Sequence, residues 1–134
     1  MAHSLVVETI DAHVRASFEH CPVLAEDDNG ESPADLGPFL VVAYPYSRSE
    51  QETVGDGADF EEEGAFTLTL AVPRGFGVRQ ARSWLDGMAV TLRAKQIGPV
   101  WCAAPQPAVL DDDRSDQAYV RLIMAVPYRF LLEG

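Results

Sequence analysis

Few side chains in this sequence have the types and spacing that chemistry requires. His13 and His20 are two of the three histidines, and they lie seven residues apart on an expected helix, near one face of it. Imidazoles so placed can share a metal, but a protein zinc site needs at least a third ligand. None is evident before Pro22 stops the helix. A packed or solvated histidine is therefore the better interpretation at both positions.

Two acidic clusters raise the possibility of a calcium site. Asp111, Asp112 and Asp113 are followed by Asp116, but the spacing lacks the Asp-x-Asp-x-Asp-Gly loop and the distant bidentate glutamate of such sites. A solvated hairpin turn fits these residues better. The acidic run 61–63 is interpreted in the same way, as a loop that repels other anions.

The segment Arg74-Gly75-Phe76-Gly77 precedes an expected helix, as phosphate-binding loops do. No Lys-Ser/Thr pair follows it, and the third glycine of a dinucleotide fingerprint is absent. A tight strand-to-helix turn is the simpler interpretation. The sequence also has no Gly-x-Ser-x-Gly nucleophile motif. It therefore predicts no enzyme, no cofactor and no metal site.

Composition narrows the class of protein further. The 134 residues fit one domain, and 47% of them are hydrophobic, which is enough for a core. The net charge of -11 argues against wrapping nucleic acid, because that affinity comes from cations that neutralise phosphates. Cys21 and Cys102 form no CxxC pair and are expected to be reduced thiols. No signal peptide or membrane span of about 20 apolar residues is evident, so synthesis in a host cytoplasm is expected.

Hydrophobic periodicity predicts an α+β fold in the order α-β-β-α-β-β. Helices are expected from Ser4 as N-cap to Pro22, and from Val78 to the break at Gly98-Pro99, with an apolar stripe that runs to Leu92. Strands are expected over residues 39–46, 65–72, 100–110 and 119–130, with Pro105 and Pro107 confining the third to an edge or a bulge. This makes a single four-stranded, antiparallel-rich mixed sheet with two helices, most simply on one face. Residues 25–38 and 47–63 are expected to be mobile loops, within one domain that spans residues 1–134.

These strands carry more apolar surface than two helices on one face can cover. The residues concerned are Leu40, Val42, Tyr44, Trp101, Val109, Tyr119 and Ile123. A contiguous apolar patch is unusual on a monomer, so a partner is expected to cover it. The alternative is that one helix covers each face of the sheet and the patch is ordinary core.

Two segments resemble a known family. EGAFTLTLAVPRGFG (residues 63–77) runs from a glycine through an alternating strand and a Pro-x-Gly-x-Gly turn into a helix. VRLIMAVPY (residues 120–128) ends a strand on a hydrophobic-Pro-aromatic unit. In this order and spacing they resemble the tail terminator proteins of long-tailed phages and of phage-like gene transfer agents, over most of residues 4–131.

The resemblance implies a structural virion protein at the head-tail junction. Its subunits would form a homo-oligomeric ring, usually of six, that caps the tail tube protein, stops tail polymerisation and offers a platform for head-tail joining by the head-completion or connector protein. DNA would pass through the lumen without specific binding. Acidic residues from 50–63 or 111–116 would line or rim it, among them Glu61, Glu62, Glu63, Asp111, Asp112 and Asp113. Arg48, Arg79 and Arg82 are candidates for bridges between subunits.

Two other functions stay open at this stage. A head-completion or other connector subunit would share the small α+β form and the virion location. A small bacterial binding module would instead hold a ligand between helix and sheet, and would be a monomer in solution.

Overall fold

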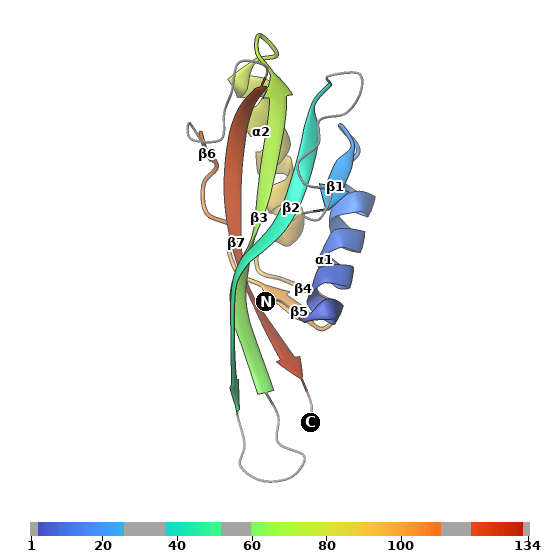
Figure 1. The fold of residues 1–134 in the computed structure, drawn as a ribbon, viewed down its shortest axis with the longest axis vertical. Coiled ribbons are helices and arrows are strands. Elements are labelled where there is room, and N and C mark those ends of the chain that lie inside the picture. Colours follow the sequence, from blue (N-terminus) through green and yellow to red (C-terminus); the bar gives the residue numbers. More distant parts are fainter. Residues whose placement is uncertain (1–2, 26–36, 52–59, 111–118, 133–134) are drawn as a thin grey trace.

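The computed structural model describes residues 3–25, 37–51, 60–110 and 119–132 (Figure 1). Within these residues two helices and seven strands follow one another. In order they are α1 (Ser4–Ser17), β1 (Val23–Ala25), β2 (Phe39–Gln51), β3 (Phe60–Pro73), α2 (Val78–Leu92), β4 (Lys95–Ile97), β5 (Val100–Cys102), β6 (Val109–Leu110) and β7 (Tyr119–Leu132).

All seven strands belong to one curled, mixed sheet. Its order is β1-β2-β3-β7-β5-β4, and β6 pairs with a further part of β7. Only the β1–β2 pair is parallel. The prediction of a single four-stranded sheet in the order α-β-β-α-β-β is therefore wrong. The missed strands β1 and β4 have three residues each, too few for an alternating pattern. The expected strand 100–110 is split into β5 and β6.

Both helices pack on the same face of this sheet, called here the helix-covered face. Alternation along β3 sends Phe66, Leu68 and Leu70 into the core below the helices, because successive strand side chains point to opposite faces. α1 contributes a stripe at three- and four-residue spacing, and so does α2. The buried residues of these stripes are Val6, Ile10 and Val14 in α1, and Ala81, Leu85, Met88, Ala89 and Leu92 in α2. The opposite side of the sheet, turned toward the viewer in Figure 1, is called the open face.

The ends of the helices follow from local chemistry. α1 is capped by His3 rather than by the expected Ser4, and the Nδ1 atom of His3 accepts a hydrogen bond from the backbone N–H of Leu5. α2 follows the turn that the glycines predicted. Gly75 and Gly77 have φ angles of 91° and 112°, in a region that residues with a Cβ rarely adopt.

The expected loop 47–63 is shorter than predicted. β2 continues to Gln51 and β3 begins at Phe60, so part of the polar connection is strand. These residues pair with each other, and β3 pairs with β7 down to Leu132. The three strands extend past the end of α1 (Figure 1). Residues 26–36 and 52–59, the rest of the two expected mobile loops, lie outside the described residues.

Candidate functional site

The structure divides the predicted apolar patch between the two faces. Leu40, Val42 and Tyr44 are buried in the core of the helix-covered face. The Tyr44 hydroxyl donates to Asp11 Oδ1 of α1, 2.6 Å away. These three side chains already have partners within the chain, so their expected role at a subunit interface has no support. Trp101 and Ile123 remain as candidates, because they lie on the open face.

A shift in the β2–β3 register explains why the Tyr44 and Tyr46 side chains lie on opposite faces of the sheet. Two residues apart in a regular strand, they would share a face. The pairing instead slips by one residue between Ala43 and Tyr46, and such a bulge reverses which side chains face which way. Tyr46 consequently lies on the open face and is 57% exposed. The bulge requires Gly64, since a Cβ there would lie 2.3 Å from the carbonyl oxygen of Tyr46.

A row of alternating charges crosses the open face below this bulge. Arg48 of β2 pairs in register with Glu63 of β3, which pairs with Arg129 of β7, which pairs with Trp101 of β5. Arg48 Nη2 lies 3.6 Å from Glu63 Oε2, and Arg129 Nη2 lies 3.7 Å from Glu63 Oε1. Arg129 Nε also lies 3.1 Å from Glu61 Oε1. These pairs are exposed, so they orient the side chains more than they stabilise the fold.

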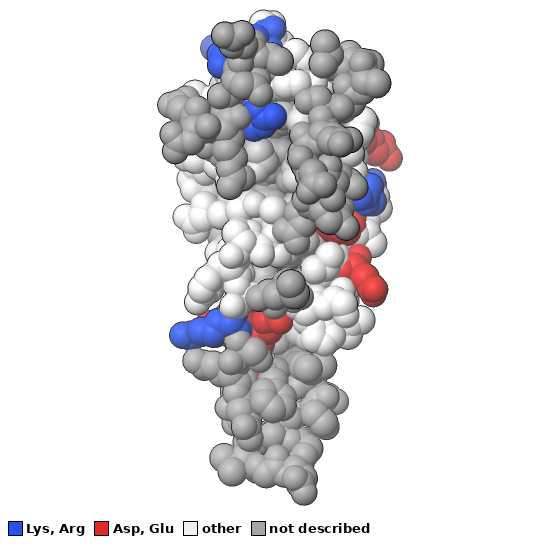
Figure 2. Space-filling view, in the orientation of Figure 1, with Lys and Arg blue, Asp and Glu red and all other residues white. Residues whose placement is uncertain are grey.

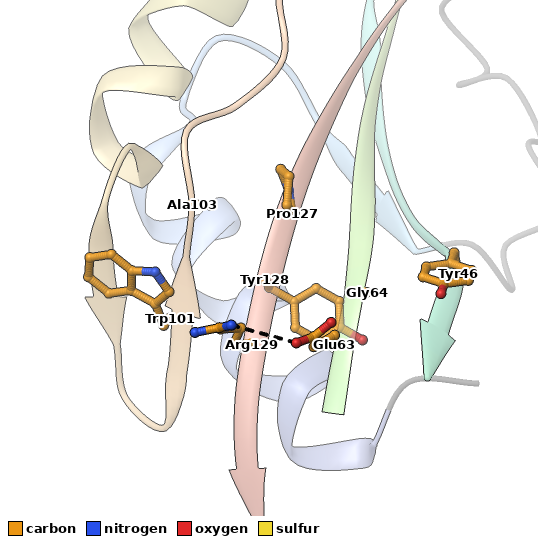
Figure 3. Close-up of a pocket in the computed structure, with 8 residues that line it drawn as sticks. All are labelled: Tyr46, Glu63, Gly64, Trp101, Ala103, Pro127, Tyr128 and Arg129. Carbon is orange, nitrogen blue, oxygen red and sulfur yellow. Dashed lines mark ion pairs between the residues drawn. The ribbon is translucent and has the colours of Figure 1, made fainter. Parts of the chain in front are cut away.

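Above this row the open face is hollowed. Trp101 and Tyr46 stand at the two sides of a cavity of about 380 Å3, with Pro127 between them and the Glu63–Arg129 pair at one end (Figure 3). Gly64, Ala103 and Tyr128 complete the lining. Trp101 is 38% exposed despite its size. The sequence pointed to Trp101 but not to Tyr46, Pro127 or Arg129 as residues of a site. The hydrophobic-Pro-aromatic unit at residues 126–128, within β7, was the available signal for Pro127.

A second hollow follows β7 on the same face. It has a volume of about 350 Å3 and is lined by Gln106, Pro107, Val109, Ile123 and Ala125. Ile123 and Val109 are register partners, so β6 forms one wall and β7 forms the floor. In Figure 2, which shows this side of the molecule, the described surface is largely uncharged across its middle. Both hollows lie beside β7 on the open face, and their apolar lining residues Trp101, Pro127, Ile123 and Val109, with Tyr46, are called here the apolar stripe. This stripe is the candidate functional site.

Glu62 does not belong to that face. It is buried on the helix-covered face, whereas Glu61 and Glu63 on either side of it point to the open face. Tyr128 Oη donates to Glu62 Oε2 over 2.7 Å, and the backbone N–H of His3 donates to Oε1 over 3.0 Å. Burial, and then this carboxylate, raise the pKa of Tyr128. Glu62 thus fixes the start of α1 to the sheet, which is incompatible with its expected place on a lumen rim.

The remaining predicted residues are dispersed. Arg79 and Arg82 lie on the exposed side of α2, where Arg82 Nη1 donates to the carbonyl of Ala108 over 2.9 Å. Asp111, Asp112 and Asp113 lie outside the described residues.

No catalytic centre emerges from the described part of the chain. His13 contacts Thr91 at 3.3 Å, whereas His20 stacks on Trp84 with ring centroids 4.6 Å apart. Burial raises the pKa of both Cys21 and Cys102 to about 11, so both thiols are protonated and weakly nucleophilic at neutral pH. Among the described residues no three His, Cys, Asp or Glu side chains are grouped to hold a metal ion. None of the described helices has the length and apolar character that crossing a bilayer requires.

Comparison with known proteins connects this geometry to a family. A family model described as phage tail terminator protein matches residues 3–97. A solved protein structure that carries no functional name aligns with 100% of this chain and 99% of its own, with a TM-score of 0.63 and 16% sequence identity. At that identity the likeness shows a shared fold. No curated protein matches the sequence.

Proposed function

The chain belongs to the phage tail terminator family, and we propose that it forms a ring of identical subunits that caps the tail tube. The ring stops tail polymerisation, offers a platform for the head-completion or connector protein, and leaves a lumen through which DNA passes. The family places the protein among the structural components of a phage tail. The ring, its six subunits and its partners are the proposed part.

The observation that carries this proposal is the apolar stripe on the open face. Trp101, Tyr46 and Val109 are all substantially exposed there, beside two hollows. Aromatic side chains next to a pocket, with an arginine at the edge, are typical of the residues that dominate protein–protein binding energy. Removing a few hundred Å2 of apolar surface from water contributes several kcal/mol at ~25 cal/mol per Å2. A tail component with such a stripe is suited to contact a neighbouring subunit or the tube.

Charge supports a passage for DNA rather than a binding site for it. The net charge of -11 repels a polyanion, and like-charged walls leave DNA hydrated and mobile. Glu61 and Glu63 are largely compensated by Arg48 and Arg129 on the open face. Glu62 is withdrawn from the proposed rim because it is buried. The proposal for Asp111, Asp112 and Asp113 rests on the sequence alone.

The test combines assembly with imaging. Tail tubes polymerised with the purified protein should stop at a defined length and carry an annular cap at one end, and tubes without it should grow overlong. Trp101→Ala should weaken capping by at least tenfold because it removes one side of the larger cavity, whereas Trp101→Phe should retain most of it. Both variants should unfold at nearly the wild-type temperature, since Trp101 is outside the core.

Three results would count against the proposal. A chain that stays monomeric at all concentrations and leaves tube length unchanged overturns it. Binding to the head connector with no effect on tubes favours the head-completion alternative. A monomer that retains a small molecule favours the ligand-binding alternative.

A further inference from the structure

The outward side of α2 carries a surface that the core does not explain. Arg79, Arg82, Asp86, Val90 and Arg93 recur at spacings of three and four, so they follow one side of the helix, opposite its buried stripe. All five are exposed. Val90 is 60% exposed, more than any other large hydrophobic residue of the described chain. This surface, together with Gly87, is called the α2 ridge.

The ridge has the opposite charge to the rest of the protein. Residues 74–95 contain five of the ten basic residues, Arg74, Arg79, Arg82, Arg93 and Lys95, and one acid, Asp86. The segment therefore has a formal charge of 5 − 1 = +4, which leaves −11 − 4 = −15 for the remainder. Within the described residues neither Arg79 nor Arg93 takes part in an ion pair.

Gly87 supplies a second, independent observation. Glycine weakens a helix interior relative to alanine, so its presence there usually has a packing reason. A close contact within the chain would be the usual reason, but a Cβ built on Gly87 meets nothing within 4 Å. Among the described residues, no contact requires the glycine. A bare backbone beside an exposed valine is instead suited to the close approach of another polypeptide.

We propose that the α2 ridge of one subunit packs against the outward side of α1 in a second copy of the chain. That side of α1 presents Leu5, 44% exposed, next to the exposed carboxylate of Glu8, and Glu19 follows the helix. In an antiparallel packing of the two helices Arg79 would face Glu19 and Arg93 would face Glu8. Asp86 would then lie opposite Arg15, the exposed base between the two glutamates, and Val90 and Leu5 would lie at the same end of the contact. The inference rests on the self-assembly proposed above and assigns a surface to it.

Charge also restricts the symmetry of this contact. Two ridges packed against each other would place arginine opposite arginine, which disfavours a twofold dimer through α2. The ridge must therefore meet a different surface of its neighbour, and contacts between unlike surfaces generate closed rings when their rotation closes. α1 lies beside β1 at one edge of the sheet, and α2 lies behind its middle strands (Figure 1). One subunit can thus offer both surfaces at once.

The sharpest test uses Gly87, because the isolated subunit and the assembly should respond in opposite directions. Gly87→Ala should raise the unfolding temperature of the monomer by about 3 °C, as expected for a stronger helix in a chain of this size. Gly87→Leu should leave the monomer folded and raise the dissociation constant between subunits at least tenfold. Sedimentation analysis measures the association.

A charge exchange tests the choice of partner. Arg79→Glu with Arg93→Glu should weaken association at least tenfold and reduce its salt dependence, and Glu8→Lys with Glu19→Lys should do the same. Mixing the two double variants should restore an assembly that neither forms alone.

The possible failures can be told apart. A wild-type chain that never oligomerises overturns both this inference and the ring. Wild-type rings that persist in every ridge variant overturn the inference alone. Ridge variants that keep their rings but no longer bind tail tubes would show that a different tail protein, not a second copy, covers α2.

Discussion

Leu122 and Ile123 are neighbours in β7, yet they meet opposite surroundings. Leu122 is fully buried in the core under the helices, whereas Ile123 borders a hollow of about 350 Å3 on the open face. The same alternation holds along β3, where Glu62 is enclosed and Glu63 is exposed. One face of the sheet is completed by its own helices. The other face has a small buried cluster of Phe39, Ala71 and Tyr119 but keeps the apolar stripe and the two hollows exposed. Apolar content in a strand therefore does not tell whether its partner lies within the chain.

The largest expected effect compares the two β7 neighbours directly. Leu122→Ala should lower the free energy of unfolding by about 3 kcal/mol, because it leaves a cavity in a closed core. Ile123→Ala removes an equal number of carbons but should cost only about 1 kcal/mol, since that side chain is already partly solvated. Denaturant unfolding of the subunit measures both. Equal losses would mean that the two faces do not differ in the isolated chain.

The next effect concerns the bulge that separates Tyr44 from Tyr46. Gly64→Ala should destabilise the subunit by about 2 kcal/mol, because the added Cβ would press against the backbone of β2 and the Tyr128 hydroxyl. Tyr46 should lose its fixed position on the open face at the same time. Hydrogen exchange of β2 amides would report this loosening, and unchanged exchange would show that the strand tolerates a side chain there.

A smaller difference is expected between two adjacent glutamates. Glu62→Ala leaves the Tyr128 hydroxyl and the His3 N–H without their acceptor and should cost about 1–2 kcal/mol. Glu63→Ala breaks only exposed ion pairs and should change stability by less than about 0.5 kcal/mol. Thermal unfolding of the two variants side by side is the measurement. Similar losses would contradict the assignment of Glu62 to the buried network.

The sequence predicted those elements whose period extends over many residues. α1 and α2 bury several turns of one stripe, and residues 65–72 of β3 and 119–130 of β7 alternate between apolar and other side chains, so these patterns could be recognised in the sequence. β1, β4 and β6 have only two or three residues each, too few to show a hydrophobic period. The polar residues at the ends of β2 and β3 belong to strands because the long strands β2, β3 and β7 satisfy one another's backbone hydrogen-bonding groups. The composition of these segments does not reveal this pairing.

The candidate site was predicted only in part, again because some of its features leave no hydrophobic pattern in the sequence. Trp101 and Ile123 were correctly identified as sheet residues, and the structure places both on the open face. Tyr44 was assigned to an interface and Tyr46 was missed, because a one-residue bulge exchanges the faces of two side chains and leaves no mark on hydrophobicity. Glu62 was grouped with Glu61 and Glu63 as one acidic run, although alternation in a strand separates them.

The smallest expected effect lies where the helices meet on the covered face. Burial lowers the pKa of His13, and its hydrogen bond with Thr91 only partly opposes this. The unfolded chain, with an ordinary pKa near 6.5, therefore takes up this proton first as pH falls. Above about pH 7.5 His13 is neutral in both the folded and the unfolded chain, so it costs the fold no stability. The free energy of unfolding then declines as pH falls through 6.5 toward the lower folded pKa. His13→Gln has no proton to gain, so its unfolding temperature should fall less than that of the wild type between pH 7.5 and 5.5. If the unfolding temperatures of the two proteins fall equally, the pH sensitivity lies elsewhere in the chain. His13 would then be as accessible to water as a residue of the open face.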